Sequence, residues 1–102
     1  MVKLVALYEK PDDEQAFWEH YEKVHAPLTR ELPGLQDLEL LRVTADAFGG
    51  EAPFYLVATM SFADEEAFKA AMRSDENKRL GKDLMSFAKG KVKVLVTETH
   101  AV

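Results

Sequence analysis

The chain has 102 residues, 47% of them hydrophobic, and this length predicts one domain, residues 1–102, built around one small core. Its 18 acidic and 13 basic side chains give a net charge of −5, which disfavours nucleic acid and membrane surfaces as partners, and no segment approaches the ~20 apolar residues that span a bilayer. Because the sequence contains no cysteine, disulfides, a thiolate nucleophile and cysteine-ligated metal centres are excluded, and a cytoplasmic location is expected.

The first two predicted elements are a strand and a long helix. Residues 2–8 are apolar and rich in strand-forming side chains, so they predict a strand. A capping box at Asp12 and Gln15 predicts the start of the helix, and Pro33 with Gly34 predicts its end. The apolar residues of the helix recur at helical spacing: Phe17, Tyr21, Val24, Leu28 and Leu32.

Pro27 lies in the middle of this helix, in the stretch HYEKVHAPL. Proline has no backbone N–H, so the carbonyl of Lys23 loses its helical partner, and a proline in a helix interior costs roughly 3 kcal/mol. We therefore expect the helix to bend or break between Lys23 and Pro27, which opens room beside His25 for a ligand or water. The alternative is a tolerated kink without a role.

The second half of the chain predicts a hairpin, a divided helix and a last strand. Residues 35–44 and 54–62 are strand-like and are joined by DAFGGEAP, whose paired glycines suit a hairpin loop. Acidic residues at 64–66 open a helix that starts again at Ser74, so two helical segments are expected. Valines at alternate positions predict a final strand over residues 92–99.

The resulting order, β-α-β-β-α-β, predicts an α+β fold of the ferredoxin-like type, with the helices on one face of a four-stranded antiparallel sheet. The uncovered face of such a sheet is expected to be polar. Here both faces of the strands are apolar, for example Leu4 and Ala6 against Val5 and Leu7. We therefore expect a second copy of the chain to cover the free face, giving a homodimer packed sheet against sheet.

His25 lies at the edge of the apolar stripe of the first helix. At 100° per residue it falls about 50° from the centre of the stripe, close in direction to Trp18, so it can reach the space between helix and sheet. Histidine exchanges a proton near neutral pH because its usual pKa is about 6.5. His25 is therefore a candidate acid–base residue, and the alternative is a structural histidine bonded to a backbone carbonyl.

Five further residues are candidates for a pocket beside His25. Asp83 lies at the edge of the apolar stripe of the last helix and is a candidate polar group, with a solvated surface aspartate as the alternative. Four aromatic residues are candidates to line an apolar cavity, with ordinary core packing as the alternative: Tyr8, Trp18, Tyr21 and Phe62.

Other kinds of site are not expected. His20 and His25 are five residues apart, about 140° around an α-helix, so they do not form a metal-binding pair like that of metalloproteases. No serine lies in a G-x-S-x-G elbow, and the glycines form neither a Walker loop nor a dinucleotide fingerprint. A zinc site, a serine-hydrolase triad and a nucleotide site therefore lack support.

Several motifs together resemble those of the EthD family of the dimeric α+β barrel superfamily. The first is F-W-x-x-Y-x-x-x-H-A-P-L at residues 17–28, followed by L-P-G-L at residues 32–35. The second half contributes F-x-x-x-x-A-F-x-x-A-M-x-S at residues 62–74 and D-L-x-x-F at residues 83–87. The resemblance covers nearly the whole chain, and H-A-P-L is its most specific element.

The resemblance implies a ferredoxin-like protomer, a homodimer formed by facing sheets, and a pocket between helices and sheet with His25 on its wall. It implies neither a metal nor an organic cofactor. Members and relatives of the family act on or bind hydrophobic, oxygenated molecules, as lactone isomerases, polyketide cyclases, decarboxylases or accessory proteins of ether degradation. The cysteines of a lactone-isomerising relative have no counterpart in this sequence.

The sequence leaves two classes of function open. The first is a cofactor-independent isomerase, cyclase or lyase, in which His25 transfers a proton on a hydrophobic, oxygenated, ring-containing metabolite. The second is a non-catalytic accessory or ligand-binding protein of a degradative or biosynthetic pathway, in which His25 is structural. Both predict a hydrophobic small-molecule ligand.

Overall fold

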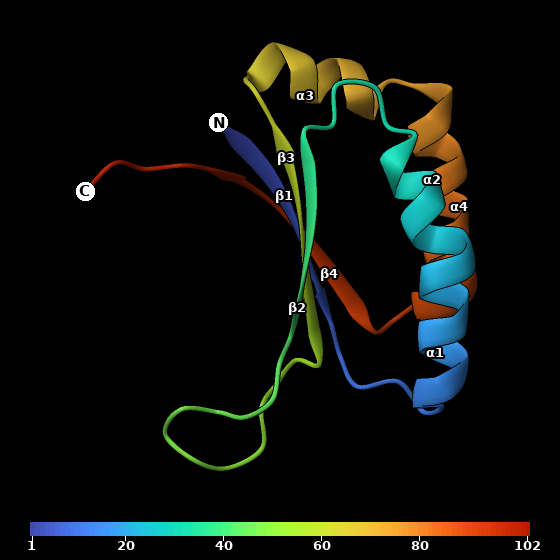
Figure 1. The fold of residues 1–102 in the computed structure, drawn as a ribbon, viewed down its shortest axis with the longest axis vertical. Coiled ribbons are helices and arrows are strands. Elements are labelled where there is room, and N and C mark those ends of the chain that lie inside the picture. The colour runs from blue at the N-terminus through green and yellow to red at the C-terminus, as the bar shows by residue number, and fades with distance from the viewer.

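A computed structural model describes residues 1–102, and it confirms the ferredoxin-like α+β fold. Four strands form one antiparallel sheet in the order β2-β3-β1-β4. The strands are β1 (Val2–Tyr8), β2 (Asp37–Arg42), β3 (Leu56–Phe62) and β4 (Val92–Glu98). Figure 1 shows the helices packed on one side of the sheet. No helix is both long and apolar enough to span a membrane.

Polar side chains cap three of the helices at their N-termini. Asp13 caps α1 (Glu14–His20) by accepting from the backbone N–H of Ala16, so the cap lies one residue later than the expected Asp12. Asp64 caps α3 (Glu65–Met72) in the same way. Ser74 caps α4 (Asp75–Ala88), which confirms the expected division of the second helical region.

The first helix widens into one π-helical turn instead of breaking. This turn, η1 (Tyr21–His25), joins α1 to α2 (Ala26–Arg30). In η1 the backbone N–H of Ala26 donates to the carbonyl of Tyr21, five residues earlier, and both ends keep right-handed helical backbone angles. Pro27 then falls in the first turn of α2, where a missing N–H is tolerated. Where a bend or break was expected, the helix therefore continues without a break and changes its type.

The wide turn shifts the buried face of the helix by one residue. An extra residue in a turn rotates everything after it by about 100° relative to an α-helix. Val24, expected on the apolar stripe, is 39% exposed, whereas His25 is 5% exposed. One turn later, Thr29 is buried and Leu28 only partly so. The expected rim position of His25 was therefore wrong, because the expectation assumed an unbroken α-helix.

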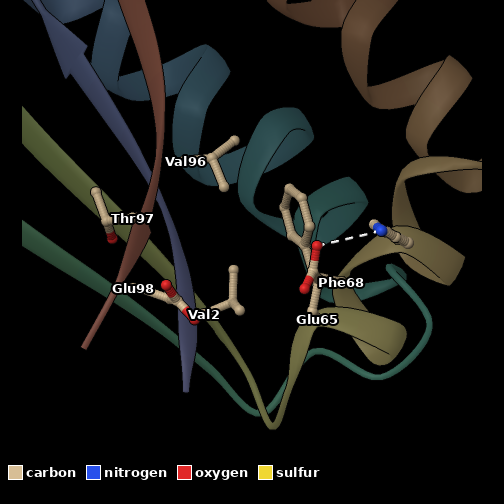
Figure 2. Close-up of a pocket in the computed structure, with 7 residues that line it drawn as sticks. Val2, Glu65, Phe68, Val96, Thr97 and Glu98 are labelled. Atoms are coloured by element: carbon tan, nitrogen blue, oxygen red, sulfur yellow. Dashed lines mark ion pairs between the residues drawn. The ribbon is translucent and has the colours of Figure 1, made fainter. Parts of the chain in front are cut away.

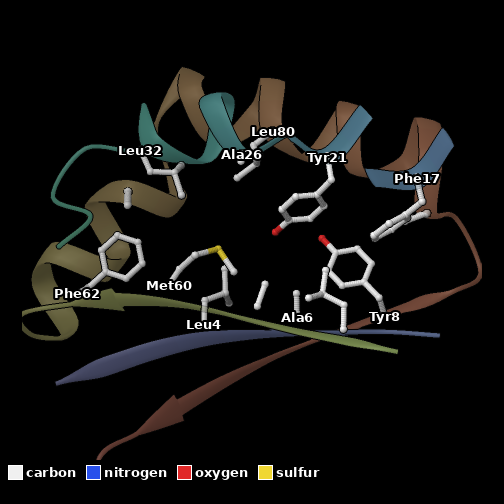
Figure 3. Packing of buried hydrophobic residues seen from close by; sticks show 14 residues of the cluster. Leu4, Ala6, Tyr8, Phe17, Tyr21, Ala26, Leu32, Met60, Phe62 and Leu80 are labelled. Carbon is white, nitrogen blue, oxygen red and sulfur yellow. The ribbon is translucent and has the colours of Figure 1, made fainter. Parts of the chain in front are cut away.

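The core lies between the helices and the covered face of the sheet. Along β1 the alternate residues Val2, Leu4, Ala6 and Tyr8 are buried and point toward the helices. Figure 3 shows these side chains of the sheet meeting those of the first helix, with the hydroxyls of Tyr8 and Tyr21 pointing toward each other. The aromatic rings of Tyr8, Phe17 and Tyr21 pack edge-on or tilted at centroid distances of 5.6 to 5.8 Å.

The opposite face of the sheet carries no helix (Figure 1). Strand pairing places five apolar side chains together on this free face: Val5, Leu7, Leu41, Val57 and Leu95. Leu41 and Leu95 are each about half exposed, at 48% and 49%. The loop between β2 and β3 and the C-terminal residues also extend on this side (Figure 1). Polar side chains share this face, including Lys3, Glu39 and Lys93, so the free face carries an apolar cluster but is less apolar than the sequence predicted.

Candidate active site

One carboxylate holds two histidines between the two main helices. Asp83, on α4, accepts from Nδ1 of His25 at 2.8 Å through one oxygen and from Nε2 of His20 at 2.9 Å through the other. The side chains of Asp83 and His25 are 12% and 6% exposed, whereas that of His20 is 31% exposed. The three residues form a cluster that runs from the protein surface into the interior.

The π turn explains how one carboxylate reaches both histidines. In an α-helix, residues five apart point about 140° away from each other, so α-helical spacing does not predict a pairing of His20 with His25. In η1 the backbone bonds link residues five apart, which turns the two imidazoles toward the same side of the helix. Phe87, one turn after Asp83 on α4, packs against both rings at centroid distances of 4.7 and 4.9 Å.

The carboxylate fixes the protonation pattern of both imidazoles. An ionised carboxylate only accepts hydrogen bonds, so His25 carries its hydrogen on Nδ1 and His20 carries its hydrogen on Nε2. The free lone pair of neutral His25 is then on Nε2. Burial lowers the pKa of His25 below its usual value, and the hydrogen bond and charge of Asp83 oppose this shift only in part. His25 is therefore a neutral base at neutral pH.

His25 lines an apolar cavity of about 190 Å³ between the helices and the sheet. Nine of the twelve residues around this cavity are hydrophobic, so its walls suit a hydrophobic ligand. Tyr8, Tyr21 and Asn77 provide its other polar atoms besides His25. Val94, on the edge strand β4, lines the cavity while 43% exposed, which places the opening between β4 and α4.

The residues predicted for the pocket divide into two groups. Tyr8, Tyr21 and His25 line the cavity, and Asp83 acts behind His25 without lining it. Trp18 points to the far end of the helix, where its indole N–H donates to the hydroxyl of Tyr55 at 2.8 Å. Phe62 is fully buried at the end of β3 against Phe68. The structure does not bring Trp18 or Phe62 into the cavity, because each packs at an opposite end of the helical layer.

A second cavity, of about 230 Å³, lies where α3 meets the ends of β1 and β4 (Figure 2). Val2, Phe68 and Val96 provide its apolar wall. Its charged groups are Glu98 and the exposed ion pair between Glu65 and Lys69. This cavity shares no lining residue with the cavity of His25 and contains no histidine or tyrosine. It therefore lacks the acid–base groups of the first cavity.

Comparison with known proteins gives consistent matches over nearly the whole chain. The family model described as EthD domain matches residues 10–91. A crystal structure of an ethyl tert-butyl ether d (ethd) family protein from Bacillus halodurans is 48% identical, covers 98% of this chain and 99% of that chain, and superposes with a TM-score of 0.92. An uncharacterized 11.0 kDa protein from the thcB-thcC intergenic region of Rhodococcus erythropolis is 29% identical, and the match spans 100% of this chain and 98% of that protein.

A more distant structure shares the fold. SnoaB from Streptomyces nogalater, described as a cofactor-independent oxygenase, is 17% identical to this chain and has a TM-score of 0.70. The match covers 99% of this chain and 94% of SnoaB. At this level of identity the similarity concerns the fold alone.

Proposed function

Because the chain belongs to the EthD family, we propose that it is a cofactor-independent enzyme that moves a proton on a small, hydrophobic, oxygenated ring compound. The reaction class is that of an isomerase, cyclase or lyase. His25 is the acid–base residue, and the apolar cavity holds the ring.

One observation carries the proposal: a buried histidine is oriented by a carboxylate on one side and borders an apolar cavity on the other. Asp83 occupies Nδ1 of His25, which leaves the lone pair of Nε2 for a ligand. A base with a lowered pKa stays unprotonated at neutral pH and is available to accept a proton. A purely structural histidine needs neither an adjoining cavity nor a free nitrogen.

The proposed step conserves all protons and electrons. Nε2 of His25 accepts a proton from a carbon next to the carbonyl of the ligand, and the electrons of that C–H bond form an enolate. The resulting imidazolium is stabilised by the charge of Asp83, with which it shares a hydrogen bond at 2.8 Å. His25 then returns the proton to a different atom, which completes an isomerisation without a net change in oxidation state.

The size of the expected rate effect limits the substrate. A single positioned base contributes typically about 10² to 10⁴ in rate, so the C–H bond must already be acidified by a neighbouring carbonyl. The fold is shared with SnoaB, described as a cofactor-independent oxygenase, which supports chemistry without a bound cofactor on this architecture.

A non-catalytic ligand-binding protein is the second candidate, since the same apolar cavity suits a carrier or accessory protein. The two candidates differ in what they require at residue 25. A binder needs a hydrogen-bonding group there, which glutamine supplies. An enzyme needs a group that exchanges a proton near neutral pH, which glutamine cannot do.

Hydrogen–deuterium exchange at carbon distinguishes the candidates. A panel of one-ring ketones and lactones is incubated in D2O with wild-type protein, with His25→Gln, and with His100→Gln as a control at an exposed histidine near the C-terminus. NMR follows the loss of the hydrogens next to the carbonyl. The enzyme predicts at least about 100-fold faster exchange for one panel member, lost in His25→Gln and kept in the control. No acceleration for any member, or full acceleration in His25→Gln, contradicts it.

We further propose that two copies associate through the free face of the sheet. The five apolar side chains of that face form a continuous patch across four strands, and a monomer would leave this patch in water. A second copy of the same face covers it with matching apolar surface.

A further inference from the structure

Two buried hydroxyl groups meet at one end of the cavity of His25. Tyr8 is 2% exposed and Tyr21 is 1% exposed, and both residues line the cavity. Their hydroxyls point toward each other (Figure 3), and each tyrosine is the side-chain hydrogen-bond partner of the other. The rings of Tyr21 and His25 lie 5.2 Å apart, so the hydroxyls and the imidazole border the same small space.

Counting hydrogens shows that this pair has a donor to spare. Each tyrosine hydroxyl carries one hydrogen, and only one of the two hydrogens can lie between the two oxygens. At least one hydrogen therefore remains for a third oxygen. Burial raises the pKa of Tyr21 to about 12 and raises that of Tyr8 as well, so both hydroxyls keep their hydrogens at neutral pH.

We propose that this end of the cavity, where the hydroxyls of Tyr8 and Tyr21 meet, binds the carbonyl oxygen of a one-ring ketone or the oxygen of the enol formed from it. The inference rests on the function proposed above, because it places the carbonyl oxygen next to the carbon from which His25 takes the proton. A hydrogen bond from tyrosine strengthens as negative charge develops on that oxygen, so it stabilises the enolate more than the ketone.

The cavity volume sets the size of the ligand. An apolar protein cavity of about 150 Å³ accommodates benzene. The cavity here is about 190 Å³, which corresponds to one six-membered ring with one or two small substituents. The enclosed part of the cavity therefore suits a monocyclic ketone or a lactone of similar size.

A pair of probes of equal shape tests the hydrogen bond. Cyclohexanone and methylenecyclohexane differ in having C=O or C=CH2 on the same ring, and their binding is compared by NMR titration. The wild type is expected to bind cyclohexanone about three- to tenfold more tightly, as one net hydrogen bond provides. The double variant Tyr8→Phe with Tyr21→Phe is expected to lose this preference while still binding methylenecyclohexane.

The single variants and a control make the test specific. Either tyrosine alone keeps one hydroxyl hydrogen, so Tyr8→Phe and Tyr21→Phe should each retain part of the preference. Tyr55→Phe removes a hydroxyl outside the cavity, where it accepts from Trp18, and should leave the preference unchanged. Circular dichroism confirms that the double variant is folded, which is expected because replacing both members of a buried polar pair by apolar groups is nearly neutral.

The outcomes separate this inference from the proposed function. A preference that survives in the double variant, or no preference in the wild type, overturns the tyrosine site. If the protein gives either of these results but still catalyses hydrogen–deuterium exchange at carbon, the proposed function of His25 is not contradicted. Conversely, a preference that depends on the two tyrosines, without any catalysed exchange, supports the oxygen site and contradicts the enzyme. Failure of both probes to bind overturns the tyrosine site as well.

Discussion

Replacing Asp83 by asparagine tests whether the carboxylate sets the state of both histidines. The carboxylate accepts from His25 at 2.8 Å and from His20 at 2.9 Å. The amide of asparagine has one accepting oxygen and one donating NH2 group, so it satisfies only one of the two N–H groups. The other imidazole must move its hydrogen to its second nitrogen. If that imidazole is His25, the lone pair facing the cavity is lost.

The size of the effect follows from the two hydrogen bonds. Bonds to a charged group contribute about 1.5 to 3 kcal/mol each, and neutral bonds contribute about 0.5 to 1.5 kcal/mol. The change from charged to neutral bonding therefore costs roughly 1 kcal/mol or more for each histidine. Removing a carboxylate that is only 12% exposed also relieves its desolvation, which offsets part of this loss. We expect the free energy of unfolding to fall by about 1 to 2 kcal/mol.

Urea denaturation measures the stability, and nitrogen-15 NMR of the imidazoles reports which nitrogen carries the hydrogen. Asp12→Asn is the matched control, because the side chain of Asp12 is 95% exposed and its replacement removes the same charge without a histidine contact. The pKa of His25 should fall further in Asp83→Asn, since the hydrogen bond and charge of Asp83 are what raise it. A stability within about 0.5 kcal/mol of wild type, together with unchanged imidazole protonation, would refute the reasoning.

Three further results are expected. Because burial lowers the pKa of His25, the unfolded state binds the proton more readily, so stability should be full above about pH 6.5 and decline as the pH falls below it. In denaturation curves from pH 8 to pH 5, the stability of His25→Gln should decline less than that of the wild type. An identical decline in both proteins would show that His25 is not the cause. Gly81→Ala should raise the free energy of unfolding by roughly 0.5 to 1 kcal/mol, because glycine destabilises a helix relative to alanine and an added Cβ meets no atom within 4 Å. Gly81→Leu should instead fill the mouth of the cavity and prevent binding of cyclohexanone in an NMR titration. A stable Gly81→Leu protein that still binds the ketone would place the ligand elsewhere. Val57→Lys puts a charge in the middle of the free face, and an unpaired buried charge costs several kcal/mol. Sedimentation of this variant should therefore show a monomer or an unfolded chain. An intact dimer would contradict the sheet-to-sheet model.

The sheet was predictable because strand patterns depend on local residues. A run of apolar, strand-forming residues placed β1 at the residues where the structure has it, and the restart at Ser74 followed from its capping side chain. The second and third strands are shorter than expected, although the bond from the Val43 N–H to the Tyr55 carbonyl continues their pairing by one step. The local residue pattern therefore predicts which strands exist, and in what order, better than it predicts the residues at which they begin and end.

The site was less predictable because it depends on a helix type that the residue pattern does not reveal. Counting 100° per residue placed Val24 inside and His25 on the rim, and it separated His20 from His25. The available signal was Pro27, whose missing N–H pointed to irregular hydrogen bonding nearby but not to its form. The pairing of Asp83 with two histidines depends on contacts 58 and 63 residues apart in the chain, which no local spacing can reveal.

The π turn also affects how this helix tolerates insertion and deletion. Val24 is the extra residue of this turn, and it is 39% exposed. Deleting it would convert the turn to ordinary α-helix and would place His25 and Ala26 three and four residues after Tyr21, where an α-helix keeps neighbours on one face. A relative that is one residue shorter here can therefore keep its histidine against the same aspartate. In an alignment, a single gap at this point marks a change of helix type and not the loss of the site.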